Sequence, residues 1–173
     1  TSSPYSAISA FALHPIYLRL SIISGASVFK SKINEYAKEN TSHLEYHKTL
    51  KFKESILNAI YNNAKEKLLT NNTLAEWVKK NNWVKIYAVY RLLREELGHN
   101  WQAWPKEFLN PTTEWIEKKW NSNFEKVLYY AWVQKECEKQ LRESALVLDK
   151  LNVKLKGDIP ILISEDSADA WGN

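Results

Sequence analysis

Four acidic residues near the end of the chain are the side chains best suited to chemistry. Asp158 precedes a short apolar run, residues 159–163, and Glu165, Asp166 and Asp169 follow it. The β-branched residues in this run predict a buried strand of a parallel sheet. In α/β barrels, residues at the carboxyl ends of strands bind substrate and catalyse. Because a carboxylate beside an apolar strand must be paired or face a polar cavity, we expect Asp158 to be functional.

The acidic loop also has an interpretation that requires no chemistry. Asp166 or Ser167 can cap the amino end of a helix, which is a common use of these residue types. Glu165 and Asp169 can be solvated loop acids. For Glu165 and Asp169 we favour this structural interpretation.

The opening segment, residues 3–18, is the second candidate for a functional loop. It is rich in small and polar residues and contains the pair His14-Pro15. This composition fits an ordered loop that hydrogen-bonds a ligand, and it fits a purely structural loop equally well.

Aromatic residues are unusually frequent, with 8 Trp and 9 Tyr. Such rings either pack a core or stack on the apolar faces of glucose units, and core packing is the more general explanation. Trp101 and Trp104 are the best candidates for sugar platforms, although Trp104-Pro105 can instead pin a turn.

The remaining reactive side chains do not point to a site. His43 and His47 lie four residues apart on an expected helix, as two metal ligands could. No third ligand is evident, so we expect a solvated helix and no metal or other cofactor. Cys137 is interpreted as a packing residue.

Helical periodicity dominates the middle of the chain, and these helices must position both loops. Predicted helices cover residues 43–69, a short stretch capped by Thr73, a stretch from about Val84 to a C-cap at Gly98, a stretch capped by Thr112 or Thr113, and about 123–152. On the last helix the expected buried face consists of Phe124, Val127, Leu128, Ala131, Val133, Leu141, Ala145 and Leu148.

Composition narrows the class of protein. A chain of 173 residues with a net charge of +4 suggests one domain or part of a larger one. The sequence contains no charge-free apolar run of ~18 residues, so no membrane span is predicted. No signal peptide is recognisable. A single cysteine favours a reducing, cytoplasmic location. Only Lys48, Lys51 and Lys53 form a modest basic cluster, so we expect no nucleic-acid partner.

The two loops together resemble one enzyme family, the 4-α-glucanotransferases of glycoside hydrolase family 77. The opening motif is Ser3-Pro4-Tyr5-Ser6, then Ser9-Ala10-Phe11-Ala12 and His14-Pro15. The closing motif is Gly157-Asp158-Ile159-Pro160-Ile161, then Asp166-Ser167-Ala168-Asp169-Ala170-Trp171. Between them, in the family's order, are Trp83, Tyr87-Ala88, Trp101-Gln102-Ala103-Trp104-Pro105, Gln134 and Gln140, with Leu141 where the family usually has Trp.

The resemblance implies a mainly α chain, a helical insertion of a (β/α)8 barrel with partial barrel elements at both ends. Residues 1–24 and 153–173 would be barrel-derived, and residues 25–152 would form the helical subdomain. Because the chain lacks Met and stops just after a dense motif, we expect it to be part of a longer protein.

The resemblance also implies a function in starch, glycogen or maltose metabolism, which is the transfer of α-1,4-glucan segments by a retaining mechanism. Tyr5 matches a tyrosine that packs against the sugar at the cleavage site, and Asp158 matches an acid that supports sugar binding. Ser3 and Asp166 lie in the same motifs and are further substrate-binding candidates.

The nucleophile and the acid/base belong to later strand motifs, such as an Arg-Ile-Asp segment, that this sequence lacks. We therefore expect the chain alone to be inactive. The alternative interpretation is a non-catalytic helical interaction or glucan-binding module.

Overall fold

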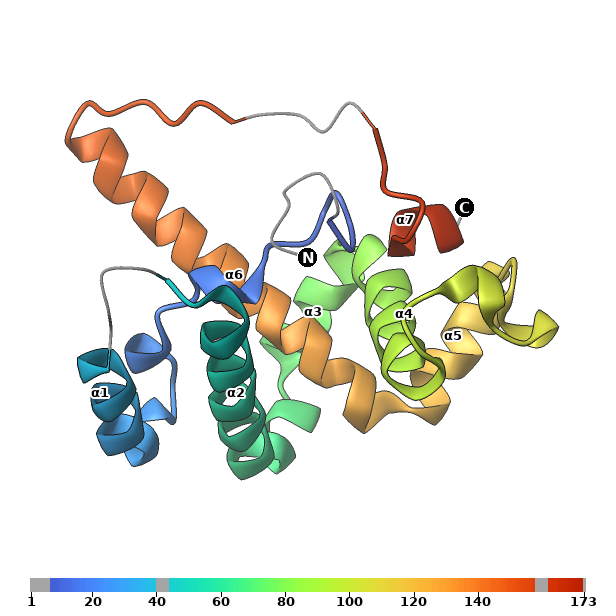
Figure 1. Ribbon diagram of the computed structural model, residues 1–173, viewed down its shortest axis with the longest axis horizontal. Coiled ribbons are helices and arrows are strands. Elements are labelled where there is room, and N and C mark those ends of the chain that lie inside the picture. Colours follow the sequence, from blue (N-terminus) through green and yellow to red (C-terminus); the bar gives the residue numbers. More distant parts are fainter. Residues whose placement is uncertain (1–6, 40–43, 158–161, 173) are drawn as a thin grey trace. The chain divides into compact units, whose positions relative to one another are not determined.

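The computed structural model describes residues 7–39, 44–157 and 162–172. Within these ranges the regular structure is helical and no strand forms (Figure 1). The α-helices are α1 (Lys30–Lys38), α2 (Tyr46–Leu69), α3 (Asn72–Lys80), α4 (Trp83–Leu97), α5 (Thr113–Ser122), α6 (Phe124–Lys150) and α7 (Ala168–Trp171). Short 3-10 helices are η2 (Pro15–Tyr17), η3 (Leu20–Ile22), η4 (Ala26–Phe29), η5 (Trp101–Ala103) and η6 (Lys106–Phe108). The prediction of a mainly α chain is confirmed.

The chain folds as two compact units. The first contains residues 1–12, 72–132 and 155–173, and the second contains residues 13–71 and 133–154. The predicted division into barrel-derived ends and a helical middle concerns the parent fold and remains a prediction.

The first unit is built around α4. This helix contacts α5 and α7, because its buried residues surround most of its circumference. The predicted end of α4 at the C-cap Gly98 is confirmed. The φ of Gly98 is +98°, which lies in the region that favours glycine. The predicted cap of α5 is also confirmed, because the Thr112 side chain accepts a hydrogen bond from the Trp115 N–H. The cap at Thr73 is wrong, since α3 begins one residue earlier, at Asn72.

The second unit packs α2 against the 3-10 helices η2, η3 and η4. Its core includes Leu18, Leu57 and Ile60. Lys53, a member of the modest basic cluster, is partly buried. Its half-buried ammonium donates hydrogen bonds to the carbonyls of Ile16 and Leu18, the latter at 2.8 Å, and burial lowers its pKa.

Helix α6, orange in Figure 1, runs close to its predicted bounds. Val127, Leu128, Ala131 and Val133 are buried as expected, and Cys137 is a buried packing residue. The expected buried face is wrong at Phe124 and Leu141, which are 37% and 48% exposed, and Ala145 and Leu148 are only partly buried. Periodicity identifies an apolar stripe but does not show where a neighbouring element stops covering it.

The predicted strand falls largely outside the described residues. Its last two members, Leu162 and Ile163, are described, and both are exposed and lie outside any strand. The expectation of a buried strand is therefore wrong at these two positions. A strand requires a hydrogen-bonded neighbour, and no partner strand forms within the described ranges. The described helices include none that is long and apolar enough to cross a membrane.

Candidate functional site

Three of the six predicted site residues, Ser3, Tyr5 and Asp158, lie outside the described residues. The other three, Asp166, Trp101 and Trp104, all belong to the first unit. Their hydrogen-bond and ion-pair partners lie in the second half of α4, on its C-cap and in the loop before α7. The structure therefore brings these three residues to one cluster, which we call the α4-end cluster: Tyr90, Arg94, Trp101, Trp104, Glu165 and Asp166.

Asp166 is held through both of its carboxylate oxygens. The Tyr90 hydroxyl donates to Oδ1 at 2.9 Å, and the Arg94 guanidinium pairs with Oδ2 at 3.0 Å. Arg94 also donates from Nε to His99 Nδ1 at 2.9 Å. Burial raises the pKa of Tyr90, and its hydrogen bond to Asp166 raises it further. The side chain of Asp166 is still 43% exposed, so its carboxylate remains accessible to solvent.

Trp101 links η5 to the acidic loop. Its indole N–H donates to the backbone carbonyl of Glu165 at 2.7 Å. The residue is only partly buried, so ring surface is left open for stacking. Glu165 itself is exposed, which confirms its interpretation as a solvated loop acid.

Trp104 does not suit the role of a sugar platform. It is 4% exposed, and its ring packs against Tyr90 and Trp171 at centroid distances of 5.5 and 6.0 Å. Its indole N–H donates to the carbonyl of Gly98 at 2.9 Å. The ring is almost entirely covered by protein, so the structure favours the alternative in which Trp104 pins the turn after α4. A sequence pattern of aromatics does not distinguish a covered ring from an open one.

The acidic loop ends at α7, and Ser167 is its N-cap, as one of the sequence interpretations proposed. The Ser167 side chain accepts a hydrogen bond from the Ala170 N–H. The expectation that Asp169 is a solvated acid is wrong. Its Oδ1 accepts from the Ser9 hydroxyl at 2.8 Å and its Oδ2 accepts from the Ala10 N–H at 2.6 Å.

Sequence reasoning missed the contributions of Tyr90, Arg94 and Asp169. Tyr90 and Arg94 are four residues apart and share one face of α4, a spacing that indicates cooperation on a helix. That signal shows which residues are neighbours but does not identify their distant acidic partner. Asp169 is separated by 160 residues from Ser9, so no local pattern could have paired them.

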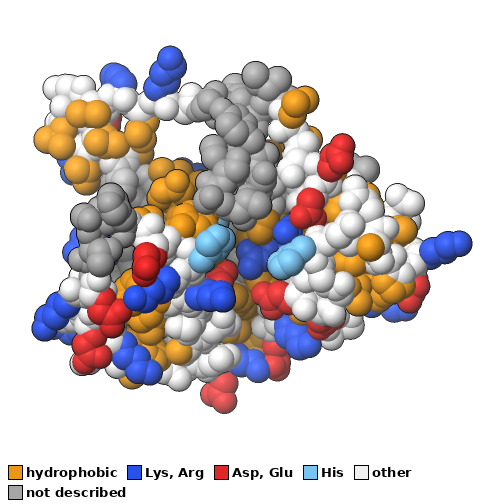
Figure 2. All heavy atoms as spheres, viewed as in Figure 1, with side chains coloured by type: hydrophobic (Ala, Val, Ile, Leu, Met, Phe, Trp, Pro, Cys, Tyr) orange, Lys and Arg blue, Asp and Glu red, His pale blue; other side chains and the backbone are white. Residues whose placement is uncertain are grey.

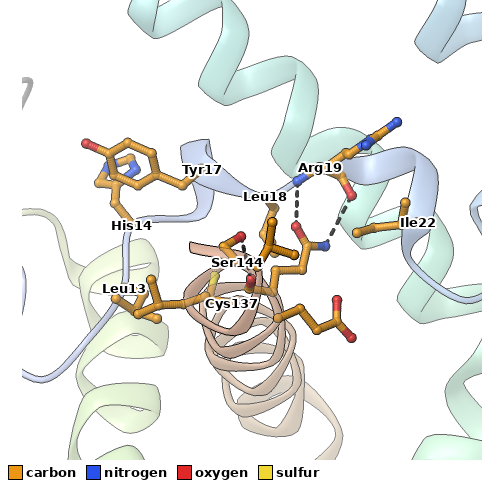
Figure 3. A pocket seen from close by; sticks show the side chains of 12 residues that line it. Leu13, His14, Tyr17, Leu18, Arg19, Ile22, Cys137 and Ser144 are labelled. Atoms are coloured by element: carbon orange, nitrogen blue, oxygen red, sulfur yellow. Dashed lines mark hydrogen bonds between the residues drawn. The ribbon is translucent and has the colours of Figure 1, made fainter. Parts of the chain in front are cut away.

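A separate pocket of about 600 Å³ lies in the second unit (Figure 3). Its walls come from η2, η3 and α6 and include Tyr17, Leu18, Cys137 and Ser144. Of the three predicted site residues that the structure describes, Trp101, Trp104 and Asp166, none lines it. His14, at its rim, is a structural residue: Nδ1 caps η2 by accepting from the Ile16 N–H, and Nε2 bonds the Tyr46 hydroxyl at 2.7 Å. For residues 14–17 the structure therefore favours the structural interpretation of the opening loop.

On the face shown in Figure 2, basic and acidic side chains are intermixed. Exposed ion pairs include Lys48 with Glu39 and with Glu45. Across the described part of the chain, no group of three or more His, Cys, Asp or Glu side chains could hold a metal ion. His43, one member of the weak histidine pair, lies outside the described residues.

Comparison with known proteins identifies the family. The 4-alpha-glucanotransferase family, glycoside hydrolase family 77, matches residues 1–173. The chain is 30% identical to 4-alpha-glucanotransferase DPE2 of Oryza sativa subsp. japonica, over 98% of this chain and 19% of that protein. It is 30% identical to the 4-alpha-glucanotransferase of Chlamydia pneumoniae, over 98% of this chain and 33% of that protein. It is 28% identical to the 4-alpha-glucanotransferase of Clostridium butyricum, over 99% of this chain and 36% of that protein.

The chain therefore belongs to the 4-alpha-glucanotransferase family, and the family resemblance of its motifs is confirmed. It spans between about a fifth and just over a third of the length of these curated relatives.

Proposed function

We propose that this chain is part of a 4-α-glucanotransferase that transfers α-1,4-glucan segments between malto-oligosaccharides or to glucose. The observation that carries this proposal is the family match along the whole chain. The relatives are named 4-alpha-glucanotransferases, a name that describes glucan transfer for those proteins. The order and spacing of the two end motifs support the same assignment.

The parent fold in this proposal is a (β/α)8 barrel, with the helices described above as an insertion. Breakdown or remodelling of starch, glycogen or maltose in the cytoplasm is the proposed setting. The helical content supports the proposed insertion, and a single, buried cysteine fits a reducing compartment. The other members of the assembly are the remaining barrel segments.

In the proposed mechanism, this chain binds substrate and the rest of the enzyme carries the catalytic carboxylates. A retaining enzyme needs a carboxylate nucleophile and a carboxylic acid about 5–5.5 Å apart, on either side of the glycosidic bond. We assign both to polypeptide outside this sequence. This chain then supplies substrate contacts: Tyr5 against the sugar ring, Asp158 and Ser3 to hydroxyls, and Trp101 as a stacking surface.

Asp166 has a mixed role in this proposal. Both oxygens already accept hydrogen bonds from Tyr90 and Arg94, but each carboxylate oxygen has a second lone pair. Its exposed edge can therefore accept one sugar hydroxyl while its position is fixed by α4.

The test is transfer activity of the complete protein with maltotriose. We expect release of glucose together with longer malto-oligosaccharides, and no glucose release by the 173-residue chain alone. In the complete protein, Tyr5→Ala and Asp158→Asn should each lower kcat/KM at least tenfold. Matched controls are Tyr17→Ala, which removes an exposed tyrosine of the second unit, and Asp149→Asn, on the exposed end of α6.

Two results would contradict the proposal. One is a complete, folded protein that produces no transfer products from maltotriose. If that protein still retained maltoheptaose on an affinity gel, the glucan-binding module would become the better assignment. The other is transfer by the 173-residue chain alone, which would require catalytic carboxylates within it.

A further inference from the structure

A clasp joins the opening segment of the chain to the start of α7. It consists of Ile8, Ser9, Ala10, Ala168 and Asp169. The Asp169 carboxylate accepts from the Ser9 hydroxyl at 2.8 Å and from the Ala10 N–H at 2.6 Å. The Ala168 N–H donates to the Ile8 carbonyl at 2.7 Å. Three hydrogen bonds therefore connect two short segments that are about 160 residues apart in the sequence.

The direction of the serine bond in this clasp is fixed. Ser9 Oγ accepts a hydrogen bond from the Phe11 N–H at 3.1 Å. Its single hydroxyl proton therefore remains for the Asp169 carboxylate. Hydrogen bonds to an ionised carboxylate are among the stronger ones in proteins. Ser9 is 3% exposed, so water competes little for this bond.

The α7 side of the clasp is firmly anchored. Trp171 is buried, packs against Tyr90 and Trp115, and donates from its indole N–H to the Phe108 carbonyl at 2.8 Å. Because α7 is fixed on α4 in this way, the clasp transmits that fixed position to residues 8–10. Phe11, which follows the clasp residue Ala10, is 65% exposed. Its ring stacks on Trp83 with a centroid distance of 6.2 Å.

We propose that Asp169 is a positioning residue for substrate binding, which acts by fixing the segment that carries Tyr5. This inference rests on the proposed function, because the sugar contact of Tyr5 is part of that proposal. Tyr5 precedes Ile8 by only three residues. A carboxylate that holds Ser9 and Ala10 therefore restrains the chain only a few residues after this tyrosine. Asp169 itself need not touch the sugar.

The test is a double-mutant cycle in the complete enzyme with maltotriose as substrate. We expect Asp169→Ala to lower kcat/KM about tenfold, mainly through a higher KM. In a Tyr5→Ala background, Asp169→Ala should lower kcat/KM less than twofold, because the residue through which Asp169 acts is already absent. Asp149→Asn, on the exposed end of α6, is the matched control and should leave kcat/KM within twofold of the wild type.

Two further variants separate positioning from general loss of folding. Asp169→Asn keeps one oxygen that can accept from Ser9 or Ala10, so it should restore part of the lost kcat/KM. Ser9→Ala keeps the hydrogen bond from the Ala10 N–H to Asp169 and should lower kcat/KM about threefold. Circular dichroism and the Tm of each variant check that it is folded, and Asp169→Asn serves as the test if Asp169→Ala is not.

The outcomes distinguish the two claims. An inactive wild-type enzyme overturns the proposed function and this inference with it. An active wild type overturns the inference alone if folded Asp169→Ala and Asp169→Asn both keep kcat/KM within twofold. The same conclusion follows if Asp169→Ala costs the same factor with and without Tyr5.

Discussion

Gln134 pairs with the backbone of Leu13 through both ends of its side-chain amide. Its Oε1 accepts from the Leu13 N–H at 2.8 Å, and its Nε2 donates to the Leu13 carbonyl at 2.9 Å. Gln140 repeats this arrangement with Arg19, at 2.8 and 3.1 Å (Figure 3). Each glutamine therefore satisfies a backbone N–H and a backbone carbonyl in a segment that has no strand partner.

The two pairs match in spacing, because six residues separate both the glutamines and their backbone partners. Six helical residues of α6 span about 9 Å, whereas six extended residues span about 20 Å. The 3-10 helix η2, Pro15–Tyr17, lies between Leu13 and Arg19 and shortens that segment. The turn after His14 is therefore what keeps both glutamine pairs in register.

Replacing Gln134 with Leu should destabilise the protein. The residue is 2% exposed, and the change leaves the N–H and carbonyl of Leu13 without these partners. We expect the free energy of unfolding to fall by about 1–3 kcal/mol, measured by urea titration. Gln102→Leu removes an exposed glutamine side chain and should change it by less than about 0.5 kcal/mol. Equal effects of the two variants would show that the Leu13 bonds contribute nothing.

Removing the carboxylate of Asp166 should weaken the α4-end cluster. Arg94, whose side chain is 15% exposed, and the Tyr90 hydroxyl would lose their shared acceptor. We expect Asp166→Ala to lower the free energy of unfolding by about 1–2 kcal/mol, less than for a fully buried pair because Asp166 is partly solvated. Glu165→Ala is the control, since only its backbone carbonyl binds Trp101. A loss of the same size in the control would point to the loop rather than to the ion pair.

Gly172 is closely packed and should not tolerate a methyl group. A Cβ at this position would lie 2.5 Å from Ile86 Cγ2 and 3.0 Å from the Ala168 carbonyl oxygen. We expect Gly172→Ala to cost about 1–3 kcal/mol of unfolding free energy through overpacking. Gly157→Ala, where a Cβ meets nothing within 4 Å, is the matched control. Adding Ile86→Ala to Gly172→Ala should recover part of the loss, and no recovery would mean that the clash is elsewhere.

Cys137 should be chemically silent while the protein is folded. Burial raises the pKa of its thiol from 9.0 to about 12, with Glu136 adding to the effect and Lys53 opposing it. The reactive thiolate is therefore scarce in the native state at pH 8. We expect Ellman's reagent to label the single cysteine only as fast as urea unfolds the chain, with Cys137→Ala as the blank. Rapid labelling without urea would contradict the buried thiol.

The same shift makes a prediction for alkaline pH. The unfolded chain releases the thiol proton near pH 9, whereas the folded chain keeps it until about pH 12. Stability from this group is therefore constant below pH 9 and falls as the pH rises between these values. Between pH 8 and pH 10, the wild type should lose more unfolding free energy than Cys137→Ala. An equal loss in both proteins would assign the pH effect to other groups.

Local patterns predicted much of the helical framework. The cap at Thr112, the end of α4 at Gly98 and the extent of α6 follow from capping preferences and apolar spacing. These signals lie within a few residues of the feature that they predict. The cap at Thr73 failed because competing cap residues adjoin it, and helix ends are then ambiguous by a residue or two.

The candidate site was predicted unevenly. Two motifs, read by resemblance, identified the family, and its match over the whole chain agrees. The role of Trp104 depended on whether a ring face is open, and the role of Asp169 depended on which segment lies against it. Both roles depend on which residues are neighbours in space, and composition and spacing do not show this.

The sequence by itself therefore determined the family, the helical character and most helix ends, because these follow from residue identity and short-range geometry. Only the tertiary structure decided how Asp169 joins Ser9, how Tyr90 and Arg94 hold Asp166, and how the Gln134 amide pairs with Leu13. The physical reason is that a hydrogen bond between residues more than 70 positions apart depends on the packing of the whole unit that brings them together.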